Sequence, residues 1–63
     1  MSNKVRDLRK QKGITQKRLS EISNVPRICI ARYEAGNNIG FANAIKLAAA
    51  LGVSIEELIG KAG

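Results

Sequence analysis

The fold is decided by residues Gln16 to Glu34, which read QKRLSEISNVPRICIARYE. A helix can begin after Thr15, because threonine is a favoured N-cap residue. It can end at Asn24, because asparagine tolerates the left-handed backbone conformation that closes many helices. A second helix can open with proline, which suits a first helical turn. These helix start and stop signals therefore predict helices over Gln16–Ser23 and Pro26–Glu34, joined by a tight turn.

The apolar residues of this stretch can converge between the two helices and fix them at a steep angle. The side chains expected in this small core are Leu19, Ile22, Val25, Ile30 and Tyr33. The opposite face of the second helix stays free, and it is expected to carry Arg27, Ile28, Ala31 and Arg32. Two short helices related in this way are the parts of a helix-turn-helix.

The remaining sequence predicts three more helices. The first covers Ser2 to Gln11 and stops at Gly13. The fourth covers Phe41 to Leu51, and its apolar spacings of three and four predict a core face made of Phe41, Ala44, Ile45, Ala48 and Leu51. A fifth starts at the capping-box sequence that begins with Ser54. Since no alternating strand pattern occurs, we expect one all-α domain, a compact bundle of five short helices over residues 1–63.

Charge points to a polyanionic partner. The chain has 63 residues and a formal net charge of +6. Residues 1–32 hold nine basic and two acidic side chains, a net charge of +7, whereas residues 33–63 have a net charge of −1. One half of the domain can thus face a phosphate backbone, which favours nucleic acid as the partner.

Several classes of protein are disfavoured. The single Cys29 cannot form an internal disulfide, and neither a signal peptide nor a long apolar run is present, so we expect a cytoplasmic protein without a membrane span. With no histidine, no glycine-rich phosphate loop and no clustered carboxylates, the chain is not expected to be an enzyme or to hold a metal or cofactor.

Residues 16–34 resemble the helix-turn-helix of the phage-repressor-like (Xre-type) DNA-binding family. Further matches to that family extend the resemblance over nearly the whole chain: Leu8-Arg9, Gly13-Ile14-Thr15-Gln16, Glu34-Ala35-Gly36-Asn37 and Leu47 to Ser54. The resemblance implies a lambda-repressor-like fold with a recognition helix over about residues 26–34. Relatives more often carry Ser, Thr or Gln at the tip of that helix than Arg27-Ile28-Cys29, so base readout is expected to rest on few side chains, with Arg27 leading.

The resemblance also implies roles for individual residues. It assigns Gln16 to a DNA phosphate, although an exposed residue at a helix start is the plainer alternative. Arg27 and Arg32 suit bidentate contacts with guanine, and a phosphate contact is the competing role for Arg32. Ile28 can pack on a thymine methyl group or be an ordinary exposed side chain. Further candidates for contacts with the DNA backbone are Arg6, Lys10, Lys17, Arg18, Asn37 and Asn38.

Three other residues are expected to have structural roles. In the family, the residues at the positions of Arg9 and Glu34 pair to tie the first helix to the end of the recognition helix, so a partly buried ion pair is implied here. Cys29 is expected to be a small filler, with a redox role as the alternative.

The leading hypothesis is a transcriptional regulator, a repressor, that binds palindromic operator DNA as a weak symmetric dimer. A second hypothesis is an antitoxin that masks a toxin. RNA binding is disfavoured because the basic half lacks an aromatic stacking platform. For the dimer contact we expect Ile59, because the last segment carries more apolar residues than a short helix needs: Val53, Ile55, Leu58 and Ile59. The alternative is that all four are buried within one subunit.

Overall fold

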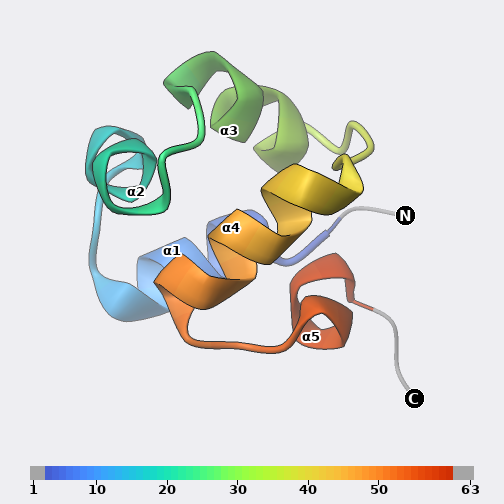
Figure 1. Ribbon diagram of the computed structural model, residues 1–63. Helices are drawn as coiled ribbons and strands as arrows, with labels where there is room; N and C mark the ends of the chain where they lie inside the picture. Colours follow the sequence, from blue (N-terminus) through green and yellow to red (C-terminus); the bar gives the residue numbers. More distant parts are fainter. Residues whose placement is uncertain (1–2, 61–63) are drawn as a thin grey trace.

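The computed structural model describes residues 3–60 and shows five helices (Figure 1). They are α1 (Val5–Lys12), α2 (Gln16–Ser23), α3 (Arg27–Glu34), α4 (Phe41–Leu51) and α5 (Ile55–Ile59). No strand occurs among these residues. The prediction of an all-α bundle of five short helices is confirmed.

The helix ends follow the chemistry of their capping residues. Thr15 caps α2, because its Oγ1 accepts the backbone N–H of Arg18 at 3.0 Å. Asn24 closes the same helix with φ at 63°, the left-handed conformation expected of it. Ser54 and Glu57 form the predicted capping box at the start of α5. Each of these caps satisfies backbone groups that a short helix leaves unpaired.

Two helices begin later than the sequence predicted. The expected start of the first helix, Ser2, lies outside the described residues, and α1 begins at Val5, whose backbone N–H is accepted by Asn3 Oδ1 at 3.1 Å. Pro26 was expected inside α3 but is extended, with ψ at 139°, and acts as the N-cap residue. Its carbonyl accepts the N–H groups of Cys29 and Ile30 at 2.9 and 3.2 Å.

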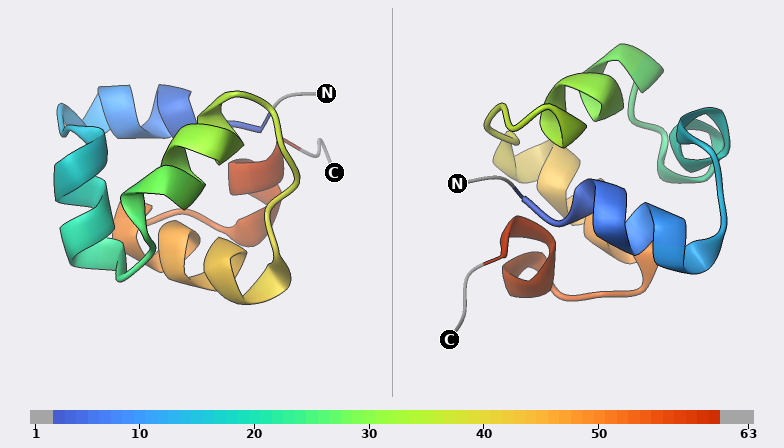
Figure 2. Two further views of the ribbon diagram at one scale, coloured as in Figure 1. Left: turned by 90° about the horizontal axis from the view of Figure 1, so that it is seen from above. Right: turned by 180° about the vertical axis from the view of Figure 1, so that it is seen from behind.

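The core gathers around α4, which packs against α1, α2 and α5. The largest fully buried side chains come from all five helices and from the turn between α2 and α3: Val5, Leu19, Val25, Ile30, Leu47 and Leu58. The inward face of α4 consists of Ala44, Leu47, Ala48 and Leu51. Figure 2 shows α2 and α3 inclined to one another at one end of this core, while α5 closes the other end against α1.

Three residues expected in the core are exposed. Phe41, which opens α4, is 73% exposed, and Ile45 is 45% exposed. Ile45 follows Ala44 directly, so it points about 100° away from that inward-facing residue. Ile22 on α2 is likewise exposed, and its neighbour Ser23 is buried instead. A buried serine is tolerated here because its Oγ donates to the Leu19 carbonyl at 2.6 Å.

Candidate nucleic-acid interface

Helix α3 presents a free outer face. Arg27, Ala31 and Arg32 are exposed, and Ile28 is 64% exposed. The inner face of the same helix is buried through Ile30 and Tyr33. In Figure 1, α3 lies at the opposite end of the molecule from α5, so its outer face is unobstructed by the bundle. A rigidly held helix with two exposed arginines at its surface is suited to insertion into a major groove.

The turn between α2 and α3 is held by side chains as well as by the core. Ser20 Oγ donates to the Val25 carbonyl at 2.7 Å, and Ser23 Oγ accepts the Val25 backbone N–H at 3.3 Å. Val25 itself is buried. These contacts fix the turn and hence the direction in which α3 leaves α2.

Two asparagines that sequence reasoning did not single out anchor the far end of α3. Asn43 Nδ2 donates to the Tyr33 hydroxyl at 2.7 Å, and Asn3 Nδ2 donates to the Tyr33 backbone carbonyl at 2.8 Å. The one available signal was a polar residue, Asn43, in the apolar helix α4. Because Tyr33 is held at both its ring and its carbonyl, α3 has a fixed position on the bundle.

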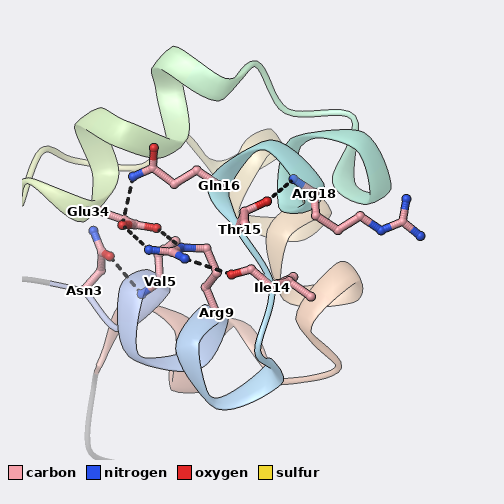
Figure 3. A network of polar contacts seen from close by, with 8 residues as sticks. All are labelled: Asn3, Val5, Arg9, Ile14, Thr15, Gln16, Arg18 and Glu34. Atoms are coloured by element: carbon pink, nitrogen blue, oxygen red, sulfur yellow. Dashed lines mark hydrogen bonds and ion pairs between the residues drawn. The ribbon is translucent and has the colours of Figure 1, made fainter.

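A network of polar contacts links three helices at the start of α2 (Figure 3). Arg9 Nε and Nη2 donate to the two carboxylate oxygens of Glu34 at 2.6 and 3.1 Å. Arg9 Nη1 donates to the Ile14 carbonyl at 2.8 Å, and Gln16 Nε2 donates to Glu34 at 3.1 Å. Only 14% of the Arg9 side chain and 7% of the Glu34 side chain are exposed. The structure thus contains the partly buried ion pair that the resemblance implied.

Burial and hydrogen bonding act on Glu34 in opposite directions. Removal from water raises the pKa of this carboxyl, but the hydrogen bonds from Arg9 and Gln16 and the charge of Arg9 together hold the pKa below its usual value. The hydrogen bond with Glu34 raises the pKa of Arg9, against the smaller effect of burial. Both groups are therefore charged at neutral pH.

The residues proposed to contact the DNA backbone lie near α3 and differ in their exposure and in their hydrogen bonds within the protein. Lys17 and Asn38 are exposed, whereas Gln16 is half-buried with its side chain bound to Glu34. Asn37 Nδ2 donates to the Arg32 carbonyl at 3.0 Å, so this exposed asparagine helps to end α3. Arg32, Asn37 and Asn38 line one hollow beside α3.

The other basic candidates lie on α1 and α2. Arg6 and Lys10 are exposed on α1. Arg18 is exposed on α2 and lies 3.4 Å from Glu21 as an ion pair. Arg6 lies near the end of α3, where its charge helps to lower the pKa of Glu34. The part of all three residues in DNA binding stays a prediction.

The last helix leaves one isoleucine at the surface. Leu58 is fully buried, Val53 and Ile55 are half-buried, and Ile59 is 36% exposed. Ile59 lines a hollow together with Ile39 and the loop residues 36–38. This places Ile59 beside the segment that connects α3 to α4.

Cys29 is half-buried and packs against the core. Over residues 3–60, His, Cys, Asp and Glu side chains form no group of three that could hold a metal ion. None of the five helices described is long and apolar enough to cross a membrane.

The fold and this surface define a helix-turn-helix domain of the DNA-binding class. Comparison with models of protein families matches residues 5–58 to the helix-turn-helix family, and the chain belongs to that family, in its Xre-like branch. The Xre-type family and the lambda-repressor-like fold, both expected from the resemblance, are thereby confirmed. No curated protein and no solved structure gives a significant match.

Proposed function

We propose that the protein is a transcriptional repressor that reads a specific duplex operator with α3 in the major groove. One observation carries the proposal: the side of α3 that faces the bundle is buried, while Arg27, Ile28, Ala31 and Arg32 are exposed together on the other side. A helix anchored on one face and open on the other can approach base edges without any change in the fold.

Base readout is assigned to the exposed face of α3. Arg27 is the first residue of the helix, where recognition helices most often reach bases, and its guanidinium can donate two hydrogen bonds to guanine. Ile28 offers an apolar surface to a thymine methyl group. Arg32, one turn further, contacts either guanine or a phosphate. Ala31 is short and lets the helix backbone come close to the groove.

Phosphate contacts are assigned to both sides of α3. On one side lie Gln16 and Lys17, at the start of α2, where unpaired backbone N–H groups and the helix dipole favour an anion. On the other side lie Asn37 and Asn38, beyond the end of α3. Contacts on both flanks would fix the register of α3 on the duplex without reading sequence.

We propose further that the domain binds as a weak homodimer on a palindromic operator, with Ile59 in the contact between subunits. Its support is the exposure of Ile59 next to Ile39 and the uncharged loop 36–38. On a palindromic operator, a symmetric dimer has to present its two α3 helices to successive major grooves, about 34–36 Å apart. Binding to DNA brings the subunits together, so the contact itself can be weak.

The proposal is tested by selecting bound sites from a random duplex library with the purified protein. A specific dimer predicts an enriched palindrome whose half-sites are about 10 base pairs apart, centre to centre. A single enriched half-site would retain base readout and remove the dimer. A library that stays random after several rounds, despite measurable binding, would refute sequence-specific recognition.

A further inference from the structure

The network around Glu34 touches a residue assigned to DNA. Glu34 closes α3, Arg9 belongs to α1, and Gln16 is the first residue of α2. Glu34 Oε1 accepts hydrogen bonds from both Arg9 Nη2 and Gln16 Nε2, each at 3.1 Å, while Oε2 accepts Arg9 Nε at 2.6 Å (Figure 3). The carboxylate therefore has one oxygen that belongs to the ion pair and one that also holds Gln16.

The side chain of Gln16 has one N–H that is not used among the described residues. A carboxamide nitrogen carries two N–H bonds, and the structure uses one of them on Glu34. Thr15 Oγ1 accepts the backbone N–H of Arg18. The backbone N–H groups of Gln16 and Lys17, which open α2, have no acceptor within residues 3–60, because the first N–H groups of a helix lack an intrahelical partner. These donors lie together at the start of one helix turn. A phosphate oxygen placed there can accept from the Gln16 side chain and from the helix end at the same time.

Charge sets a condition on this arrangement. A bare carboxylate one carboxamide away from a phosphate would repel it. Arg9 removes that repulsion, since it pairs with Glu34 through two hydrogen bonds and both side chains are largely shielded from water. The pair is neutral as a unit and still provides an acceptor that holds Gln16.

We propose that Glu34 is a positioning residue for DNA binding: it holds one N–H of Gln16 so that the other N–H is aimed at a backbone phosphate, while Arg9 cancels the charge of the carboxylate. The inference rests on the proposed function, because it assumes that Gln16 faces the duplex. It adds that the ion pair acts on DNA affinity as well as on the fold.

The substitution Glu34→Gln separates these two roles. The new side chain has a single acceptor oxygen, and the charged donors of Arg9 compete best for it. Its N–H₂ group then faces Gln16, whose carboxamide has to turn. Removing one negative charge also raises the net charge from +6, which by general electrostatics favours DNA. Weaker binding by Glu34→Gln would thus run against the trend expected from charge alone.

The test is a double-mutant cycle on duplex affinity, read by fluorescence anisotropy at a temperature where circular dichroism shows every variant folded. Gln16→Ala should weaken binding roughly tenfold, as expected for a hydrogen bond to a charged group. Its salt dependence should not change, because no charge is removed. Glu34→Gln should weaken binding about fivefold in the wild-type background and less than twofold with Gln16→Ala. The matched control Glu21→Gln removes the same charge from an exposed ion pair and should not weaken binding.

A second measurement uses the wild-type protein alone and so does not depend on the folding of any variant. In ¹H–¹⁵N spectra, one side-chain proton of Gln16 should keep its hydrogen-bonded shift when duplex is added, and the other should move. Equal effects of Glu34→Gln in both backgrounds, or loss of the Glu34 bond on adding duplex, would overturn the inference and leave DNA binding intact. No duplex binding by the wild type would instead overturn the proposed function and the inference together.

Discussion

Glu34→Ala should destabilise the fold strongly, because it leaves the Arg9 guanidinium largely buried, with only the Ile14 carbonyl as a hydrogen-bond partner among residues 3–60. Breaking a buried ion pair on one side costs about 3–5 kcal/mol. The lower end, about 3 kcal/mol, applies here because Arg9 is 14% exposed and keeps its bond to Ile14. A domain of 63 residues has a free energy of unfolding of only about 3–9 kcal/mol, so the loss is a large fraction of the total.

The assay is thermal unfolding followed by circular dichroism at neutral pH. A loss of about 3 kcal/mol in so small a domain lowers Tm by roughly 12–24 °C. The matched control is Glu21→Ala, which breaks the Arg18–Glu21 pair, whose side chains are 61% and 52% exposed. It should cost less than about 1 kcal/mol. If Glu34→Ala melts within about 4 °C of the wild type, the pair contributes little to the stability of the fold.

Three further outcomes follow from the same structure. The folded-state pKa of Glu34 lies below its unfolded value, so the ionised carboxylate stabilises the fold above the unfolded pKa of about 4.3, and this stabilisation is lost as pH falls through the folded pKa. Tm of the wild type should therefore drop more steeply in acid than Tm of Glu34→Ala. Asn43→Ala should lower the free energy of unfolding by about 1 kcal/mol, because it removes the hydrogen bond to the Tyr33 hydroxyl. An unchanged midpoint of unfolding in denaturant would mean that α3 is anchored without this bond. Ile59→Glu should leave circular dichroism unchanged and abolish cooperative gel shifts on paired half-sites; an unfolded variant would place Ile59 in the core, and unchanged cooperativity would place the dimer contact elsewhere.

The sequence predicted helix ends better than it predicted burial. Thr15, Asn24 and Ser54 act through bonds to their own neighbourhood in the chain, so their effect can be read locally. Burial depends on which side of a helix meets another helix. Ile22 and Ser23 are adjacent on α2, and hydrophobicity alone favoured the isoleucine, yet the packing against α3 and α4 buries the serine.

At the site, too, local features could be predicted from the sequence and contacts between distant residues could not. Exposure of Arg27 and Arg32 could be expected from the spacing of the buried residues Ile30 and Tyr33 on the same helix. The bond between Gln16 and Glu34 could not, because 18 residues separate them and only the angle between α2 and α3 brings them together. Asn3 and Asn43 were missed for the same reason, since both meet Tyr33 from other parts of the chain.

Base reading by the exposed face of α3 is tested most directly by the ratio of affinities for the selected site and a scrambled duplex. Arg27→Ala should weaken binding to the selected site by about 1–3 kcal/mol, leave scrambled DNA nearly unaffected and relax preference at one base pair. Lys17→Ala should weaken both duplexes alike and make the salt dependence shallower by about one unit of slope. If Arg27→Ala weakens selected and scrambled DNA equally, α3 does not read sequence through Arg27 and the assignment of the recognition face is wrong.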